Sequence, residues 1–163
     1  MCKLLVFLFE LGNHEFHTAA RIEETLNGWG IPTRRLLDTA VVGRLDGALP
    51  GPTVALRADM DALPVSEQTG LPFASTAMGQ YRGQQVGVMH ACGHDAHMAI
   101  LLGVAKALVA RRQQLPGQVL LVFQPAEEGA PRPEEGGAAL MLKQGLFADF
   151  KPEAVFGLHV FSN

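Results

Sequence analysis

Apolar residues recur at helical spacing in three segments of the chain. The spacing predicts helices over Thr18–Trp29, His94–Ala110 and Glu134–Gln144. Glycines close the first and third of these segments, as is common just beyond the end of a helix. The second segment is the strongest, and we expect one face of it to be apolar, made of Ile100, Leu101, Val104 and Leu108.

Short apolar runs bounded by glycine and proline predict strands between the helices. These runs cover Val41–Leu45, Thr53–Ala58, Gln118–Phe123 and Ala154–Leu158. Strands that alternate with helices predict an α/β fold with a largely parallel sheet. At 163 residues without an internal repeat, the chain is expected to form a single domain over residues 1–163.

Polar side chains with metal-binding capacity follow three of the predicted strands. Asp59 and Asp61 come after the strand ending at Ala58, Glu127 and Glu128 come after the strand ending at Phe123, and His159 ends the last one. Because the carboxyl ends of parallel strands meet at one edge of a sheet, we expect these side chains to converge there.

The densest group of such residues lies directly before the longest predicted helix. Cys92 and His94 are separated by Gly93, so both side chains can turn toward one ion. A helix N-terminus favours the thiolate form of Cys92. Thiolate, imidazole and carboxylate together suit zinc or another divalent transition metal.

Adjacent side chains on an irregular segment are expected to point in different directions. One carboxylate of Glu127-Glu128 can therefore bind a metal while the other holds a water molecule. Hydrolysis at a metal needs this division of labour, because the ion lowers the pKa of water and a nearby base takes its proton.

Each of these groups also has a plainer interpretation. They could form a capping loop with a buried free cysteine, a solvated acidic loop, an Asx turn before Pro64 and a structural histidine. Convergence on one edge favours the metal site. By contrast, Glu134-Glu135 is expected to serve the start of a helix, and His14 and His17 are expected to face water.

Composition narrows the functional classes. Thirteen basic and 16 acidic residues give a formal charge of −3, so neither nucleic acid nor an anionic membrane is an expected partner. Phosphate-loop, Gly-x-Ser-x-Gly and His-Glu-x-x-His motifs are absent from the sequence.

With only 2 cysteines we expect a reducing, cytoplasmic location. The apolar run Leu4–Phe9 is interpreted as the start of a strand or helix rather than as a signal peptide.

Four segments in this order resemble one known family: Leu56–Pro64, Met89–His97, Gln124–Gly129 and Gly157–Val160. Together they are similar to the metal-dependent amidohydrolases that include hippurate hydrolases, N-acyl-L-amino acid amidohydrolases and auxin-conjugate hydrolases. These enzymes belong with the aminoacylase and carboxypeptidase-like zinc exopeptidases. The resemblance runs from about Glu10 to the end of the chain and implies a three-layer αβα catalytic domain.

The resemblance implies four metal ligands, which are Cys92, His94, Glu128 and His159. It implies that Glu127 is the general base and that Asp61 orients a ligand. Asp59 falls where the wider family carries a metal-binding histidine, while Asp95 and His97 resemble residues that support the ligands. The implied cofactor is a pair of divalent ions drawn from Zn, Mn, Co and Ni. The implied reaction hydrolyses an N-acyl amino acid to a carboxylic acid and an amino acid.

Members of that family are longer, with a lid domain used in dimerisation and a later segment that brings a further histidine ligand. The resemblance therefore implies that this chain is the N-terminal part of the catalytic domain. We expect an exposed sheet edge with apolar surface, and weak binding of at least one ion. Expected partners are a small N-acyl amino acid and either a second copy or a separate C-terminal half. Two alternatives are a non-catalytic metal- or partner-binding fragment and a related metallopeptidase or deacetylase.

Overall fold

The structure is a computed structural model that describes residues 8–130 and 133–161. Its helices are α1 (Phe16–Gly28), α2 (His94–Val109) and α3 (Gly137–Lys143), with a 3-10 turn at Arg112–Gln114. Its strands are β1 (Thr33–Leu36), β2 (Ala40–Asp46), β3 (Leu49–Asp59), β4 (Met78–Tyr81), β5 (Gln84–Gly87), β6 (Pro116–Gln124) and β7 (Ala154–Gly157). Most of the apolar run Leu4–Phe9 lies outside the described residues.

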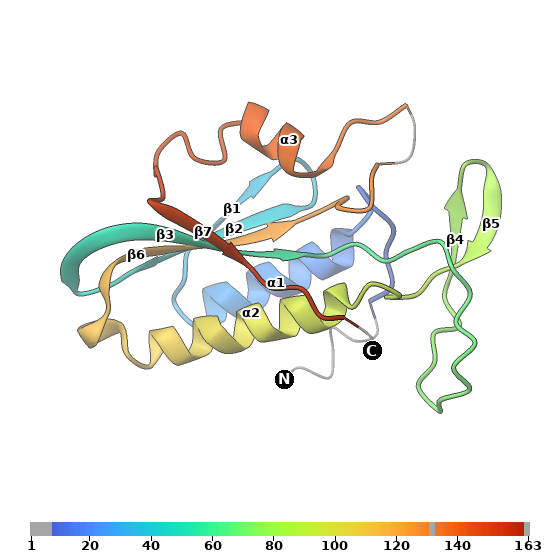
Figure 1. Cartoon of the computed structure of the whole chain (residues 1–163), viewed down its shortest axis with the longest axis horizontal. Coiled ribbons are helices and arrows are strands. Elements are labelled where there is room, and N and C mark those ends of the chain that lie inside the picture. The colour runs from blue at the N-terminus through green and yellow to red at the C-terminus, as the bar shows by residue number, and fades with distance from the viewer. Residues whose placement is uncertain (1–7, 131–132, 162–163) are drawn as a thin grey trace.

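Five strands form the main sheet, in the order β1-β2-β6-β3-β7 (Figure 1). Strand β3 pairs in parallel with β6 and β7, whereas β1 with β2 and β2 with β6 are antiparallel. The expected largely parallel sheet is therefore wrong for one half, and the sheet is mixed. Only a short turn joins β1 to β2, which permits antiparallel pairing alone, while crossovers through α2 and α3 make β3, β6 and β7 parallel.

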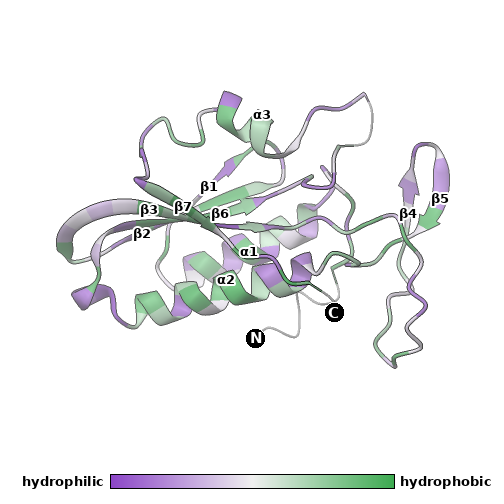
Figure 2. Ribbon diagram, in the orientation of Figure 1, coloured by the Kyte–Doolittle hydropathy of each residue, from purple (hydrophilic) through white to green (hydrophobic). Residues whose placement is uncertain are grey.

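Helices cover both faces of this sheet. Helices α1 and α2 lie on one face and α3 on the other (Figure 1), and apolar residues gather along the strands between them (Figure 2). The buried residues of β6 alternate: Val119, Leu121 and Phe123 belong to the α1/α2 core, while Leu120 and Val122 belong to the α3 core. Burial on both faces explains the continuous apolar run of β6 and confirms the three-layer αβα class.

The buried face of α2 differs from the predicted one. Of the four residues expected on it, only Leu101 is buried, and Ile100 and Val104 are exposed. The buried positions are His94, His97, Met98, Leu101, Leu102 and Ala105. This set keeps helical spacing but includes two histidines, because the face that packs on the sheet continues into the site at the helix N-terminus.

Helix α3 is shorter than predicted and begins at Gly137 instead of Glu134. Glu134 and Glu135 therefore precede the helix, where Glu134 accepts a hydrogen bond from Asn13 and Glu135 pairs with Lys143. Two successive glycines, Gly136 and Gly137, lie between the acidic pair and the first turn and delay the helix start.

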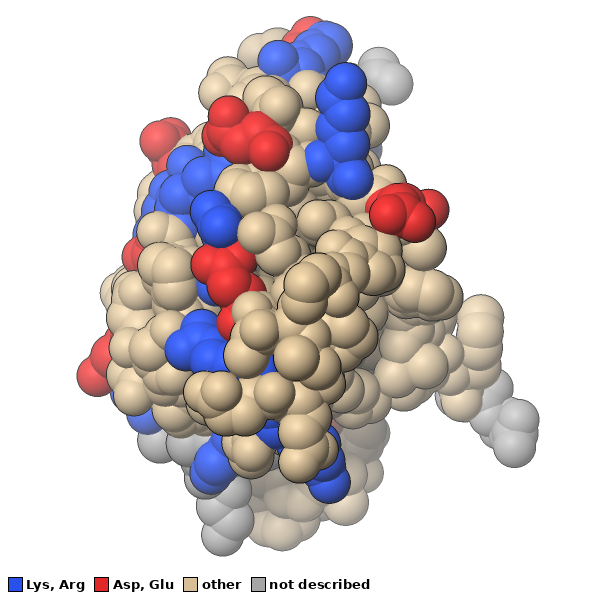
Figure 3. Space-filling model, turned by 90° about the vertical axis from the view of Figure 1, so that its left-hand side faces the viewer, with Lys and Arg blue, Asp and Glu red and all other residues tan. Residues whose placement is uncertain are grey.

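Charged residues of both signs are interspersed on the face of the molecule shown in Figure 3. Such mixing leaves no extended field of one sign over that face. Among the helices of the described residues, none has the length and apolar character needed to cross a lipid bilayer.

Candidate metal centre

The parallel strands bring the predicted residues to one edge of the sheet. Asp59 ends β3 with Asp61 two residues beyond it, Glu127 and Glu128 follow β6, and His159 follows β7. In the register of the sheet, Asp59 pairs with Gln124 and Arg57 pairs with Gly157, so the three strands end side by side. The predicted convergence is confirmed.

His94 lies at the centre of the group, fully buried in the first turn of α2. Its Nε2 atom lies 3.7 Å from carboxylate oxygens of Asp59 and Glu127, and 3.8 Å from Glu128. Among the described residues, this buried nitrogen has no hydrogen-bond partner. Buried polar atoms are normally paired, so an unpaired nitrogen among three carboxylates fits a cation at this position.

The two adjacent glutamates converge instead of diverging. Glu127 and Glu128 lie in a turn directly after Ala126, whose φ of +48° is unusual for alanine. This turn directs both carboxylates toward Nε2 of His94, which together form one possible set of metal donors. The expectation that their side chains point in different directions is therefore wrong at this turn.

Cys92 and His159 form the outer part of the site. The Sγ atom of Cys92 lies 3.4 Å from Nε2 of His159, and both can share a metal ion with His94. Gly93, between Cys92 and His94, has a φ of +77°, and a Cβ atom there would come within 2.5 Å of Val160. Glycine therefore permits both the bend and the close approach of the segment that carries His159.

Asp61 holds two parts of the site together. Its Oδ1 atom lies 3.2 Å from Nδ1 of His94, and its Oδ2 atom accepts the backbone N–H of Glu128 at 3.0 Å. Burial alone would raise the pKa of Asp61, but the contacts with His94 and with the N–H of Glu128 hold it below its ordinary value. Asp61 is therefore a charged acceptor that orients the imidazole of His94.

Asp59 and His97 form a second buried pair next to His94. The N–H of Val160 donates to Nε2 of His97 at 2.9 Å, so Nδ1 carries the proton and donates to Asp59 at 2.6 Å. Arg57 contacts the other oxygen of Asp59. Although Asp59, His94 and His97 lie close enough to share an ion, both ring nitrogens of His97 are already used. His97 thus supports the segment that carries His159, as the resemblance implies.

The supporting role that the resemblance implies for Asp95 stays a prediction. Asp95 lies in the first turn of α2, where a negative charge favours the helix N-terminus. Its carboxylate is not hydrogen-bonded to any of the four predicted ligands. Burial lowers the pKa of nearby His90, and the negative charge of Asp95 opposes that shift.

The Cys92 thiol titrates in the opposite direction to the expectation from the helix N-terminus. Burial and the carboxylates of Glu128, Glu127 and Asp59 raise the pKa of Cys92 to about 11. The nearby negative charges outweigh the helix dipole. Carboxylates crowded around a thiol and an imidazole are the donors of a divalent transition-metal site, where the positive ion reverses this effect and favours the thiolate.

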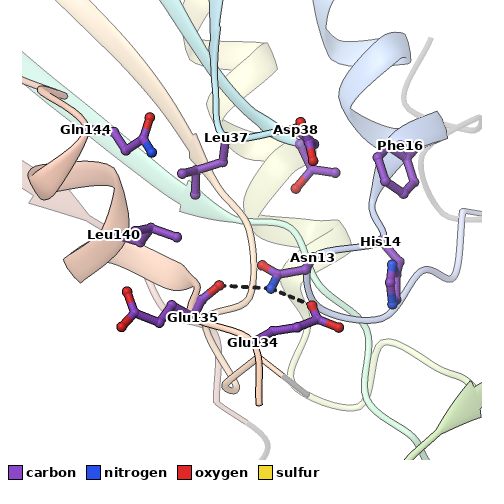
Figure 4. A pocket seen from close by; sticks show the side chains of 10 residues that line it. Asn13, His14, Phe16, Leu37, Asp38, Glu134, Glu135, Leu140 and Gln144 are labelled. Carbon is purple, nitrogen blue, oxygen red and sulfur yellow. Dashed lines mark hydrogen bonds between the residues drawn. The ribbon is translucent and has the colours of Figure 1, made fainter. Parts of the chain in front are cut away.

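A wide pocket of about 670 Å³ lies outside this donor cluster (Figure 4). Asn13, Asp38, Glu134 and Glu135 are among its lining residues, and none of the six predicted site residues lines it. His14 also lines it and, like His17, is exposed, as expected. The metal donors therefore lie outside this pocket.

Two buried or half-buried acidic residues near the N-terminus were not among the predicted site residues. Glu10 accepts the backbone N–H groups of His17 and Thr18 in the first turn of α1, and Glu15 accepts the N–H of Ala126. Burial would raise the pKa of Glu10, but the hydrogen bonds from Thr18 and His17 lower it. Glu15 lies three residues before the predicted start of the first helix at Thr18, and its partner Ala126 is 111 residues away, so no local pattern signalled this contact.

Comparisons with known proteins identify the family of this chain. Residues 55–163, more than half of the chain, match the model of peptidase family M20/M25/M40, and the chain belongs to this family. The YXEP protein of Bacillus subtilis, described as a dinuclear metal-binding peptidase of family M20, has 39% sequence identity and a TM-score of 0.83. The match covers 99% of this chain and 41% of that chain.

Two curated relatives are similar to this chain over most of its length. Thermostable carboxypeptidase 1 of Saccharolobus solfataricus is 45% identical over 156 residues, which are 94% of this chain and 36% of that protein. N-acetyl-L-cysteine deacetylase of Bacillus subtilis is 43% identical over 151 residues, covering 92% of this chain and 33% of that protein. The chain thus spans about a third of the length of these relatives. The broad family resemblance is confirmed, and the narrower hippurate hydrolase assignment stays a prediction.

Proposed function

We propose that the chain provides the metal site and the general base of a hydrolase that cleaves the amide bond of N-acyl amino acids. The buried Nε2 of His94 carries this proposal, because it has no hydrogen-bond partner in the described part of the chain and faces the carboxylates of Glu127 and Glu128 at 3.7 and 3.8 Å. The similarity to proteins named N-acetyl-L-cysteine deacetylase and N-acetyldiaminopimelate deacetylase supports the substrate class.

Four side chains would hold the metal: Cys92, His94, Glu128 and His159. The mixture of thiolate, imidazole and carboxylate suits zinc, manganese, cobalt or nickel, and a pair of ions fits the similarity to a dinuclear peptidase. A bound divalent ion supplies Lewis acidity, which lowers the pKa of water and polarises an amide carbonyl.

Glu127 is the residue best placed to move protons. Its side chain is 38% exposed, against 30% for Glu128, and it is Glu128 whose carboxylate contacts the thiol of Cys92 and, with burial, raises the pKa of that thiol. It accepts a proton from the attacking water as the C–O bond forms. It then returns that proton to the amide nitrogen as the C–N bond breaks, which releases a carboxylic acid and an amino acid. Asp61 holds His94 in the orientation that this site requires.

Metal content and turnover of the 163-residue chain test this proposal. After loading with Zn²⁺ or Mn²⁺ and dialysis, we expect one or two ions per chain and release of amino acids from N-acetyl and N-benzoyl substrates. Glu127→Gln should keep its metal and lose about 10²–10⁴-fold in rate. Cys92→Ser should lose metal. Glu24→Gln, which replaces an exposed carboxylate of α1 outside the donor cluster, is the matched control and should behave as wild type.

Each outcome decides between the alternatives. Metal binding without turnover supports the non-catalytic fragment, in which this part of the fold binds metal but needs a further segment or a second copy for hydrolysis. Turnover of dipeptides in place of N-acyl amino acids supports the related metallopeptidase, consistent with similarity to a protein named a carboxypeptidase. A folded chain without metal contradicts the proposal. The cytoplasmic location stays a prediction from composition.

A further inference from the structure

Glu15 is a fully buried acidic residue that the proposed chemistry does not use. It lies directly before α1, and its Oε1 atom accepts the backbone N–H of Ala126 at 2.9 Å. Its Oε2 atom is buried and has no hydrogen-bond partner among the described residues. An unpaired buried carboxylate oxygen destabilises a fold, so its presence here calls for a role other than stability.

The partner of Glu15 is the residue that directly precedes Glu127. Ala126 is buried and has a φ of +48°, a conformation that alanine rarely adopts. Such a conformation persists only where the surroundings hold it in place. The hydrogen bond from its N–H to Glu15 is one of the restraints that does so.

Close packing restrains the same residue from two sides. A Cβ atom added to Gly12 would come within 3.1 Å of Cα of Ala126, and one added to Gly136 would come within 3.0 Å of its Cβ. Figure 4 shows Asn13 hydrogen-bonded to Glu134 and to the backbone of Glu135, which links these two flanking segments. Ala126 is therefore enclosed by backbone that glycine alone allows to approach.

Two buried carboxylates thus hold the turn that carries the glutamate pair. Glu15 accepts the N–H of Ala126, before the pair, and Asp61 accepts the N–H of Glu128, within it. Glu127 lies between these two anchor points. Their separation and direction determine where the carboxylates of Glu127 and Glu128 point, because the turn between them has little freedom left.

We propose that Glu15 is a positioning residue that holds the Glu127-Glu128 turn in its metal-binding geometry through the N–H of Ala126. The role of this turn rests on the proposed function. Glu15 is then a third carboxylate that acts in the site beside Glu127 and Glu128, although it is distant from them in sequence and contacts neither metal nor substrate. Loss of such an indirect partner typically weakens metal affinity about 10–100-fold.

Two measurements on the ¹⁵N-labelled chain test the inference. The first is Zn²⁺ affinity by competition with a chelator, and the second is hydrogen exchange of the Ala126 amide in the metal-free protein. We expect Glu15→Ala to bind Zn²⁺ at least about tenfold more weakly and to lose protection of that amide. Glu15→Gln keeps an acceptor oxygen and should retain both. Glu24→Ala, an exposed carboxylate on α1, is the matched control.

The results separate this inference from the proposed function. A folded Glu15→Ala variant with wild-type Zn²⁺ affinity and a protected Ala126 amide overturns the positioning role. Should that variant fail to fold, Glu15→Asp, whose shorter side chain cannot reach Ala126 as well, must lose affinity where Glu15→Gln does not. If wild type binds no Zn²⁺, the proposed function fails, while loss of Ala126 protection on Glu15→Ala still supports the anchoring.

Discussion

The carboxylate of Asp61 accepts a hydrogen bond from Nδ1–H of His94 on one oxygen and from the backbone N–H of Glu128 on the other, at 3.2 and 3.0 Å. The first contact places the imidazole proton on Nδ1 and leaves the lone pair of Nε2 facing the carboxylates of the glutamate pair. One buried side chain thereby sets the tautomer of one predicted ligand and the backbone position of another.

Replacing Asp61 with asparagine should weaken metal binding. The amide offers one acceptor oxygen and cannot serve both donors, so either His94 or the N–H of Glu128 loses its partner. We expect Zn²⁺ or Co²⁺ affinity to fall about 10–100-fold, measured by titration against a chelator. Asp149→Asn, at an exposed position, is the control. Equal affinities for the two variants would argue against the orienting role.

The sequence predicted the half of the fold that carries the site. Strands β3, β6 and β7 each contain an apolar run, and the polar residues that follow each of them are visible without a structure. Their convergence follows from parallel pairing alone. The donor residues were therefore predictable as a group, although their roles came from family resemblance.

Other parts of the fold have no sequence pattern that predicts them. Strand β1 includes Arg34 and Arg35 and lies at the sheet edge, where it has no need of an apolar run. The β4–β5 hairpin is polar and turns at Arg82 and Gly83, both with positive φ, a turn that Asn-Gly would have signalled more clearly. The contact between Glu15 and Ala126 joins residues 111 positions apart, and no local pattern reports it.

His97 should matter for stability although it is not among the predicted metal ligands. It donates to one oxygen of buried Asp59 and accepts the N–H of Val160, so His97→Leu removes both hydrogen bonds and leaves Asp59 with its contact to Arg57. We expect the free energy of unfolding to fall by roughly 1–3 kcal/mol, measured by urea denaturation of metal-free protein. His14→Leu, at an exposed histidine, should change it far less. Similar losses for both would mean that the His97 contacts add little.

Glu15 should make stability depend on pH. Burial, opposed by the hydrogen bond from Ala126, raises the pKa of Glu15 from 4.5 to about 7. Between these values the folded state holds more protons than the unfolded state, so the free energy of unfolding falls as pH rises from about 4.5 to 7. The full loss is roughly 3 kcal/mol, at about 1.4 kcal/mol per pKa unit.

Glu15→Gln should remove this slope. Urea denaturation of metal-free protein at pH 5 and pH 8 measures it, and the variant should gain stability relative to wild type only at the higher pH. Glu24→Gln, which replaces an exposed carboxylate of α1, should keep the wild-type dependence. Parallel pH profiles for wild type and Glu15→Gln would falsify the assignment of the slope to this residue.

The edge strand β7 should promote self-association. It lies at the end of the sheet, and Val155 and Phe156 on it are 56% and 58% exposed, which confirms the expected apolar edge. Unpaired backbone groups beside apolar side chains favour strand addition from a second copy. Phe156→Lys places a charge on that edge and should reduce self-association, measured by light scattering across a concentration series.

Met78→Lys separates an edge effect from simple apolar exposure. Met78 is also 58% exposed but lies on β4, in the separate two-stranded sheet. If the edge of the main sheet is the cause, Met78→Lys should associate as wild type does while Phe156→Lys stays monomeric. Equal reduction by both substitutions would mean that exposed apolar area drives association, and no reduction by either would place the contact on another surface.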